Sequence, residues 1–263
     1  MGKLLDALGN EHSPIDRSIK LRIVSLVPSL TELLIDLGLY EFIVGRTGFC
    51  IHPKNLVSNI PKIGGTKDVN IEKIRSLDPS HLIVNIDENR EAIIKKISKF
   101  VPNIVVTHPI YPIDNIKLFN LMGNLFRVEK KSKELSNEFL KNLKKINDTK
   151  KKANQNIIYC IWKDPWMSIS DDTYIANMLS LIGLNTFFKN NPKRYPEFSW
   201  EKLPLEKIDK ILLSSEPYKF SSVESNYIKN QFNKDVLLVD GEMLSWYGSR
   251  SIRALKYLSN LKI

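Results

Sequence analysis

The sequence lacks the features that mark several large classes of protein. It contains no apolar run of the roughly 18–20 residues that a helix needs to span a bilayer. Its two cysteines, Cys50 and Cys160, are far apart and have no CxxC spacing, so they define no disulfide framework. The P-loop, HExxH, GxSxG and Rossmann glycine motifs are also absent. These absences argue against an integral membrane protein, a disulfide scaffold and several common enzyme families.

No export signal is recognisable near the first residues. The apolar stretch at 4–8 is shorter than the apolar core of a secretory signal, and Asp6 interrupts it. Asp6 also stands where a myristoylation signal needs Ser or Thr. Together with the unpaired Cys50 and Cys160, this pattern predicts a cytoplasmic protein. The alternative is a periplasmic or surface-anchored protein whose signal was removed.

Positive charge exceeds negative charge in this chain. There are 39 Lys and Arg residues and 29 Asp and Glu residues, which gives a formal net charge of +10. Such a balance suits nucleic acid or an anionic ligand. Many of the lysines, however, lie within residues 130–152, where they are typical of the solvated face of a helix. We therefore expect no nucleic-acid partner.

Short apolar runs alternate with helical patterns over the first half of the chain. The patterns predict strands at 21–26, 42–45, 82–84 and 104–106, and helices at 29–37, 70–77, 91–100 and 113–126. Ser29 and Glu32 have the spacing of a capping box, and Asn70 is a predicted N-cap. This alternation predicts a parallel sheet with helical crossovers.

A long charged helix follows, and the strand–helix rhythm then restarts. Apolar residues recur at spacings of three and four in 130–151, namely Leu135, Phe139, Leu140, Leu143 and Ile146. About 20 residues of helix are roughly 30 Å long, enough to bridge two lobes. Further strands are predicted at 156–161, 211–213 and 236–239, with helices at 174–182, from 200 onward and at 252–261.

The two halves also resemble each other. The patterns at 70–74 and 82–84 line up with those at 199–203 and 211–213, both at an offset of 129 residues. We therefore predict an α/β protein of two Rossmann-like lobes with mainly parallel sheets. The predicted parts are an N-terminal arm at 1–20, a first lobe at 21–127, a linker helix at 128–151 and a second lobe at 152–263.

The most informative stretch is 240–250, Asp-Gly-Glu-Met-Leu-Ser-Trp-Tyr-Gly-Ser-Arg. It follows the predicted strand 236–239 and precedes a helix, so it lies where a strand ends and where open α/β folds place ligands. Two aromatic residues, two carboxylates and an arginine in this position favour a binding loop over an ordinary strand-to-helix turn.

The first lobe resembles a known family at specific residues. The similarity lies in 23–32, Val44-Gly45, Gly64-Gly65, 70–74, Leu77-Asp78-Pro79 and Leu82-Ile83-Val84. These stretches resemble the cobalamin and iron-siderophore periplasmic-binding proteins of the TroA-like, helical-backbone metal receptor superfamily. The resemblance covers the chain from about residue 21 to its end. It implies a class III substrate-binding protein, in which two lobes joined by a single long helix hold the ligand between them.

The resemblance also implies a soluble, monomeric binding protein related to ABC transporters, with no intrinsic cofactor and no membrane span. Candidate ligand contacts are the residues on predicted loops at the carboxyl ends of the strands. These are Ser29, Arg46, Phe49, His52, Glu88, Trp162, Asp164, Trp166, Tyr195, Glu216, Tyr218, Trp246, Tyr247 and Arg250. Three tryptophans favour a large flat ligand, unless they pack the lobes together, and the arginines suit its carboxylates or phosphates. We expect cobalamin or a similar macrocycle first and a ferric siderophore second.

Two other functions are open alternatives. A transition-metal site needs three or four converging ligands, and of the histidines only His52 and His108 fall on the predicted loops. An enzyme that uses the same cleft is the second alternative, with Asp171-Asp172 for acid–base chemistry or Cys50 and His52 as a nucleophile and base. We expect neither a bound bare metal ion nor a catalytic residue.

Exported members of the family dock on a membrane permease through one surface glutamate on each lobe. The resemblance places Glu91 at this position in the first lobe, and Glu224 is the nearest counterpart in the second. Glu91 has an alternative role as a first-turn carboxylate favoured by the helix dipole. Docking is expected only if the protein is exported. A cytoplasmic protein would instead sequester its ligand or deliver it inside the cell.

Overall fold

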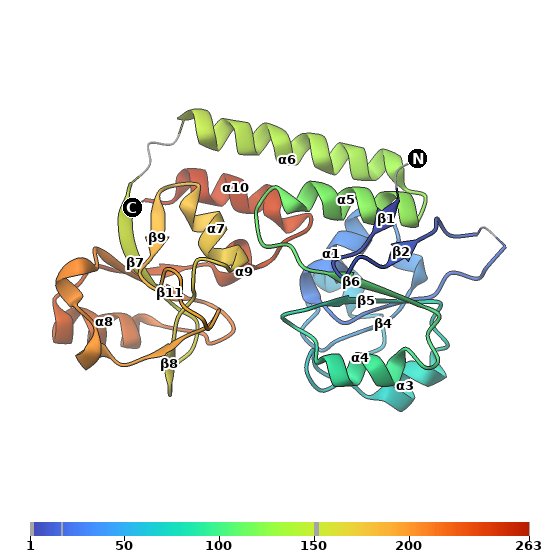
Figure 1. Ribbon diagram of the computed structural model, residues 1–263, viewed down its shortest axis with the longest axis horizontal. Coiled ribbons are helices and arrows are strands. Elements are labelled where there is room, and N and C mark those ends of the chain that lie inside the picture. The colour runs from blue at the N-terminus through green and yellow to red at the C-terminus, as the bar shows by residue number, and fades with distance from the viewer. Residues whose placement is uncertain (1–2, 17, 150–152, 263) are drawn as a thin grey trace. The chain divides into compact units, whose positions relative to one another are not determined.

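The computed structural model describes residues 3–16, 18–149 and 153–262, and the chain divides into two compact units (Figure 1). The first unit contains Met1–Pro109, Ile113–Glu138 and Tyr247–Arg250, and the second contains Ile110–Pro112, Phe139–Trp246 and Ser251–Ile263. The chain therefore passes between the units at several points, one of which lies inside the predicted linker helix. The last two residues of that predicted linker, 150 and 151, lie outside the described residues.

A four-stranded parallel sheet forms the centre of the first unit. Its strands are β3 (Ile23–Ser25), β4 (Ile43–Arg46), β5 (His81–Asn85) and β6 (Asn103–Thr107), in the spatial order β4-β3-β5-β6. Every neighbouring pair is parallel, which confirms the prediction made from alternating strands and helices. Parallel pairing follows because a helical crossover returns the chain to the end of the sheet where the previous strand began.

Helices cover both faces of this sheet. They are α1 (Pro28–Asp36), α2 (Lys54–Val57), α3 (Ile71–Ser76), α4 (Glu91–Ile97) and α5 (Asp114–Leu125), with a 3-10 turn η1 (Tyr40–Phe42) before β4. In Figure 1, α3 and α4 lie on one face of the sheet and α1 and α5 on the other. Ile74 of α3 and Ile97 of α4 pack in one buried cluster with Val24 and Leu82 of the strands. Burial on both faces explains why these strands are continuous apolar runs.

The second unit repeats the topology of the first. Its parallel sheet has the order β12-β11-β7-β9, with β7 (Gln155–Cys160), β9 (Leu184–Thr186), β11 (Lys210–Ser214) and β12 (Val236–Val239). In both sheets the second strand of the chain lies at one edge. The first, third and fourth strands follow it across the sheet. The bounds of β11 are those of β5 moved along by 129 residues. The internal similarity seen in the sequence therefore extends to the topology.

The second unit has further elements around its sheet. They are a short antiparallel pair, β8 (Trp166–Met167) with β10 (Glu197–Phe198), the helices α7 (Tyr174–Ser180), α8 (Ser222–Phe232), α9 (Gly241–Ser245) and α10 (Arg250–Asn260), and the 3-10 turns η2 (Trp200–Lys202) and η3 (Leu205–Lys207). The helix predicted from residue 200 is thus only a 3-10 turn. The predicted loop at 240–250 contains α9, because the Asp240 side chain caps its start by accepting from Met243 N–H.

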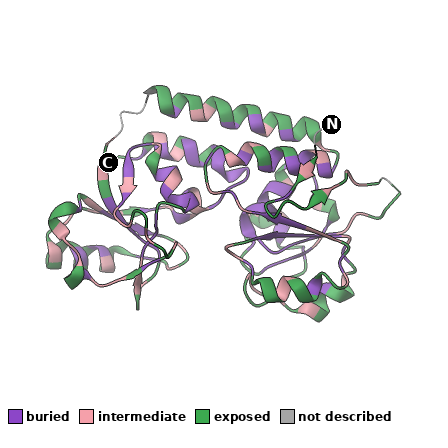
Figure 2. Ribbon diagram, in the orientation of Figure 1, coloured by how far each residue is buried: buried purple, intermediate pink, exposed green. Residues whose placement is uncertain are grey.

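The long predicted helix is α6 (Glu129–Thr149). Its buried positions are Ser132, Ser136, Phe139 and Ile146, at spacings of four, three and seven. Leu140, which the sequence analysis placed in the apolar stripe, is 44% exposed. Figure 2 shows that most of the remaining surface of α6 is exposed. No helix within the described ranges is both long enough and apolar enough to cross a membrane.

The N-terminal residues are more ordered than a loose arm. Strands β1 (Leu4–Leu5) and β2 (Glu11–His12) form an antiparallel hairpin. The Asp6 carboxylate organises its turn by accepting hydrogen bonds from Leu8 N–H and Asn10 N–H, both at 2.9 Å. The burial of Asp6 and these local hydrogen bonds explain why the N-terminal segment is ordered although its polar sequence predicted a loose arm.

The start of α1 differs from the predicted capping box. Val27 is the N-cap, and the helix begins at Pro28, whose fixed φ suits the first helical position. Ser29 and Glu32 therefore lie inside the helix. Asn70, in contrast, is confirmed as the N-cap of α3, because its side chain accepts a 2.9 Å hydrogen bond from Lys73 N–H.

Candidate functional site

Each sheet has a topological switch point between its first and third strands, because the connections after the first and second strands carry the chain toward opposite edges. Open α/β sheets bind ligands outside the carboxyl ends of the strands at such points. In the first unit this point lies between β3 and β5, whose following residues include Ser29 and Glu88. In the second it lies between β7 and β11, which are followed by Trp162 and Tyr218. These two faces, one in each unit, are therefore the candidate ligand-binding surfaces.

An exposed apolar loop follows β4 in the first unit. Phe49 is 62% exposed and Ile51 48% exposed, whereas Cys50 between them is fully buried. The Cys50 Sγ atom lies 3.1 Å from Thr31 Oγ1 and 3.2 Å from Thr47 Oγ1. Burial raises the pKa of the Cys50 thiol, so the group stays protonated and is no activated nucleophile. Cys50 therefore anchors the loop and turns its two neighbours outward.

Two glycines support the Phe49 ring. Gly48 N–H donates to Gly64 O at 2.8 Å, and Gly64 has a φ of +109°, a conformation open mainly to glycine. A Cβ atom on Gly65 would lie 3.4 Å from the Phe49 ring. The ring thus lies beside the Gly65 backbone. The exposed phenyl face is held in place by local packing and hydrogen bonding.

Glu88 and Tyr247 form a hydrogen bond at the switch point of the first unit. Tyr247 Oη donates to Glu88 Oε1 at 2.9 Å. Burial raises the pKa of Tyr247 well above its usual value, and the adjacent Glu88 carboxylate raises it further. The phenol is therefore a neutral donor. Asn89 fixes the same loop, since its side chain accepts from Asn85 N–H at 2.9 Å and donates to Thr66 O at 2.9 Å.

The structure gives Arg46 and Arg250 structural roles instead of exposing them to a ligand. Arg46 Nε donates to Val57 O at 2.9 Å, and a second guanidinium nitrogen donates to Thr47 O at 3.1 Å. Arg250 forms a buried ion pair with Glu32. Both guanidinium groups are buried, and their hydrogen bonds lie within the first unit. Their geometry therefore does not support the expected binding of ligand carboxylates.

An aromatic pair is exposed at the switch point of the second unit. Trp162 is 41% exposed, and its ring meets Tyr218 edge to face at a centroid distance of 5.7 Å. Tyr218 in turn packs on Phe220 at 4.6 Å. Such a supported aromatic edge suits contact with a flat ligand. Asp164 and Tyr195 are also exposed.

Trp166 is half-buried and packs against the aromatic core of the second unit. Its ring stacks on Phe220 at 5.6 Å with an interplanar angle of 9°, and it meets Trp200 edge to face at 5.3 Å. Trp200 stacks on Phe232 at 5.1 Å. Trp166 therefore packs within the second unit, a role that was not among the sequence-based expectations. Through Phe220 it supports Tyr218 and, beyond it, the exposed Trp162.

Glu216 and Trp246 are held together in the second unit. Trp246 Nε1 donates to Glu216 Oε1 at 2.8 Å, and Ser245 Oγ donates to the same oxygen at 2.5 Å. Burial raises the pKa of Glu216, and the nearby Glu242 and Asp240 carboxylates add to the effect. Trp246 is buried, so its indole gives little surface to a ligand. A cavity of about 380 Å³, lined in part by Ser215, Phe220, Leu238 and Asp240, opens at the carboxyl ends of β11 and β12.

The predicted contacts thus separate into two groups. The exposed or half-exposed members on the carboxyl-end loops are Phe49, His52, Glu88, Trp162, Asp164, Tyr195, Glu216 and Tyr218. The buried members are Ser29, Arg46, Trp246, Tyr247 and Arg250, and Trp166 is half-buried against the aromatic cluster. Ile51 and Ile86 are exposed but were not among the predicted contacts. Ile86 directly follows β5, and an apolar residue just beyond a strand end is a recognisable signal. Within the ranges that the structure describes, no three His, Cys, Asp or Glu side chains are grouped to hold a metal ion.

Comparisons with known proteins agree with this architecture. A family model described as periplasmic binding protein matches residues 23–238. An uncharacterized ABC transporter substrate-binding lipoprotein of Bacillus subtilis is 24% identical over 272 residues, which covers 97% of this chain and 83% of the relative. The periplasmic vitamin B12-binding protein of Vibrio cholerae superposes with a TM-score of 0.77 at 17% identity, covering 90% of this chain and 94% of that chain.

A third similar protein was solved with a ligand. The structure of Staphylococcus aureus IsdE complexed with heme has a TM-score of 0.76 at 19% identity, and the match covers 92% of this chain and 98% of that chain. At these identities the likeness to the solved structures shows the fold alone. The fold is that of a class III substrate-binding protein, with two parallel four-stranded sheets.

Proposed function

This chain belongs to the periplasmic binding protein family, and from that premise we propose that it binds a cobalamin-like macrocycle, with a ferric siderophore as the second choice. The family consists of binding proteins and not of enzymes, and the chain is a substrate-binding protein of the vitamin B12, heme and iron-chelate type. The proposal concerns which of these ligands it takes and which residues contact it.

The observation that carries the proposal is the exposure of supported aromatic rings at the carboxyl-end loops. Phe49 lies against Gly65 in the first unit, and Trp162 lies against Tyr218 in the second. A globular protein exposes large apolar side chains singly without consequence, but rings fixed at the ligand-binding edge of an α/β sheet are typical of a binding surface. We propose Phe49, Ile51 and Trp162 as apolar contacts, with Glu88 and Tyr218 as polar ones.

A ligand panel tests this function directly. The purified protein is incubated with cyanocobalamin, hemin, a ferric hydroxamate siderophore or a bare ferric or zinc salt, and its thermal unfolding is recorded. Saturation with a ligand at about 100 times its Kd stabilises the folded state by about 2.7 kcal/mol, which raises the melting temperature. A shift with cyanocobalamin supports the first choice and a shift with the siderophore alone the second. A shift with hemin alone, with bare metal salts alone or with none of them would contradict the proposal.

The two glutamates proposed for permease docking differ in their surroundings. Family members bind small ligands and dock on ABC permeases. Glu91 lies at the start of α4, is exposed and pairs with Lys95 at 2.7 Å. Glu224 forms the capping box of α8 with Ser221, and Lys163 lies 3.6 Å from it. We propose Glu91 as the docking contact of the first unit and assign Glu224 first to the helix cap.

The compartment is a separate prediction. The sequence predicts a cytoplasmic location, whereas the Bacillus subtilis relative is described as a lipoprotein and the Vibrio cholerae protein as periplasmic. The comparisons therefore lend no support to the cytoplasmic prediction. Fractionation of cells that express the natural protein decides it: recovery outside the cytoplasmic fraction supports delivery to a permease, and recovery inside it supports sequestration or intracellular delivery.

A further inference from the structure

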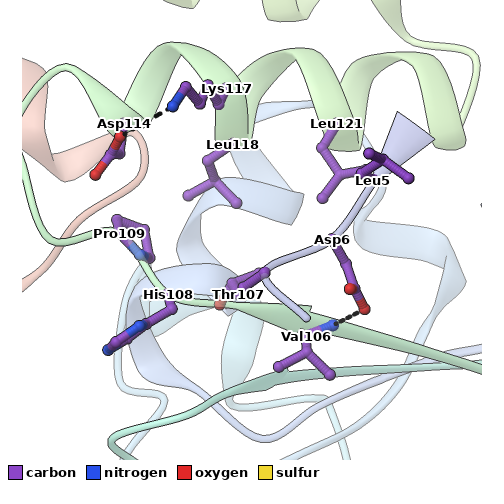
Figure 3. A pocket seen from close by; sticks show the side chains of 11 residues that line it. Leu5, Asp6, Val106, Thr107, His108, Pro109, Asp114, Lys117, Leu118 and Leu121 are labelled. Carbon is purple, nitrogen blue, oxygen red and sulfur yellow. Dashed lines mark hydrogen bonds and ion pairs between the residues drawn. The ribbon is translucent and has the colours of Figure 1, made fainter. Parts of the chain in front are cut away.

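Strand β12, at one edge of the second sheet, differs from both edge strands of the first sheet. The N-terminal hairpin covers the β6 edge, where Ala7 N–H donates to Val106 O at 2.9 Å and Val106 N–H donates to Asp6 Oδ2 at 3.2 Å (Figure 3). The β4 edge bonds to the segment after α2, since Arg46 N–H donates to Pro61 O at 3.0 Å. Within the described residues, β12 pairs with β11 on one side and with no strand on the other.

The outer side of β12 presents backbone groups that can form hydrogen bonds. Asp235 O accepts from Ile211 N–H at 2.9 Å, and Val239 O accepts from the residue after β11 at 3.1 Å. The backbone groups of successive residues in a strand point to opposite sides, so Val236 and Leu238 direct their N–H and C=O groups away from β11. Such a row of groups is a template for another strand.

The side chains on one face of β12 are complementary to the same strand in the reverse direction. Alternation along the strand places Lys234, Val236, Leu238 and Asp240 on one face. Val236 packs against the buried cluster that contains Ile228 of α8, whereas Leu238 is 45% exposed. An antiparallel copy of this strand sets the cation opposite the anion and each apolar side chain opposite another.

Both charged groups can form further bonds. The Lys234 ammonium donates to Ile208 O at 2.8 Å and has three donors in all. One oxygen of the Asp240 carboxylate accepts from Met243 N–H at 3.2 Å, and the second oxygen is a further acceptor. Asp235 is exposed, and alternation places it on the other face of the strand.

We propose that β12 pairs with β12 of a second copy of this chain in an antiparallel dimer with two-fold symmetry. The axis passes at Leu237, so Val236 and Leu238 of one copy exchange backbone hydrogen bonds with Leu238 and Val236 of the other. Lys234 of each copy lies opposite Asp240 of the other. The dimer departs from the monomer that the family resemblance implies, and it forms whether or not the main ligand is bound.

Sedimentation velocity of the full chain tests the dimer. A strand pair buries less surface than the roughly 800 Å² per partner of a standard interface, so association should be weak and depend on concentration. Between micromolar and millimolar loading, the average mass should rise from that of one chain toward that of two. A chain that stays monomeric over this range, or that grows beyond two copies, would overturn the proposal.

A matched pair of leucine variants locates the interface. Leu238→Lys places a charge on the edge of the strand and should abolish the rise in mass. Leu140→Lys on α6 is the control, because Leu140 is 44% exposed and lies outside β12. It should leave self-association unchanged. Equal self-association of the two variants would contradict an interface at β12.

Disulfide cross-linking tests the register. The axis sets Leu237 opposite its own copy in a non-hydrogen-bonded pair, where Cα atoms lie about 4.5 Å apart, within reach of a disulfide. Leu237→Cys should therefore give a covalent dimer when oxidised with diamide. Val223→Cys on α8 should not, although Val223 is 71% exposed, and the native Cys50 and Cys160 are buried. An equal or greater yield from Val223→Cys would overturn the pairing at Leu237.

Charge reversal separates the pairing from damage to the fold. Lys234→Glu and Asp240→Lys each set like charges opposite one another across the axis, so each should weaken self-association by about twofold or more. The double variant restores opposite charges and should associate as the wild type does. Circular dichroism checks that each variant is folded. Losses that add up in a folded double variant would overturn the proposed register.

Discussion

Arg250 and Glu32 lie 218 positions apart in the chain and form a buried ion pair with two hydrogen bonds. Arg250 Nε donates to Glu32 Oε2 at 2.7 Å, and a terminal guanidinium nitrogen donates to Oε1 at 3.1 Å. Gly248 N–H also donates to Asn115 Oδ1 at 2.6 Å. These bonds explain why Tyr247–Arg250 belongs to the first unit although the residues on either side belong to the second.

Removal of Arg250 should strongly destabilise the protein. Arg250→Leu removes the guanidinium that forms an ion pair with the buried Glu32 carboxylate. Breaking a buried ion pair from one side lowers the free energy of unfolding by about 3–5 kcal/mol. The double variant Arg250→Leu with Glu32→Leu should recover most of this loss, because no buried charge is left unpaired. Urea denaturation of the wild type and the variants measures both effects. A loss below about 1 kcal/mol in the single variant would show that water or another group compensates Glu32.

Gly248 should tolerate a side chain less well than Gly38 does. Both residues have positive φ, +76° and +84°, so alanine strains the backbone at either position by about 1 kcal/mol or more. A Cβ atom on Gly248 would also lie 3.2 Å from the Leu33 Cβ atom, whereas Gly38 has open space around it. Gly38→Ala is therefore the matched control for backbone strain. Equal losses of unfolding free energy in the two variants would mean that the contact with Leu33 relaxes without cost.

Phe49 should contribute to ligand binding and Phe42 should not. Both are exposed phenylalanines of the first unit, but Phe49 follows β4 at its carboxyl end and Phe42 precedes it. Phe49→Ala should weaken binding of the ligand identified in the panel by about 1–3 kcal/mol, because it removes aromatic contact area. Phe42→Ala should leave affinity unchanged. Titration calorimetry compares the two, and equal affinities would remove the loop after β4 from the binding surface.

Glu216 should make stability fall as the pH rises. Burial raises its pKa in the folded protein above the ordinary value of 4.5, so the folded state binds more protons than the unfolded state at pH values between the two. Stability is therefore lost as the pH increases from about 4.5 through the folded pKa. Glu216→Gln preserves an acceptor for Ser245 and Trp246 and should remove this dependence. Denaturation at a series of pH values measures it, and parallel stability curves for the variant and the wild type would refute the assignment.

His81 should have the opposite dependence. Burial lowers its pKa from 6.5 to about 4, with a contribution from repulsion by His12. The unfolded chain therefore takes up a proton between these values while the folded protein does not, and about 2–3 kcal/mol of stability is lost as the pH falls from 6.5 toward 4. His81→Gln should lose less stability over this range. If the variant and the wild type lose the same amount between pH 7 and pH 4.5, His81 is not the group responsible.

Local sequence patterns predicted most of the elements because they depend on neighbouring residues. The run 82–84 became the centre of β5, and Asn70 caps α3 through its own side chain. The capping box predicted at Ser29 and Glu32 was wrong because Pro28, in the same stretch, is better suited to begin the helix. A capping box that the sequence analysis did not predict lies at Ser221 and Glu224. Glu224 was instead a candidate for permease docking.

The sequence by itself determined the alternation of strands and helices, the internal offset between β5 and β11 and the family to which the chain is similar, since each depends on short-range patterns. Only the tertiary structure decided which aromatic and charged residues reach solvent. Trp162 and Trp166 are four positions apart, yet Trp162 is 41% exposed and Trp166 is half-buried and stacks on Phe220. Arg250 is an ordinary cation in the sequence and is buried because Glu32, far away in the chain, offers a charge of opposite sign. Burial depends on such long-range partners, and local patterns do not encode them.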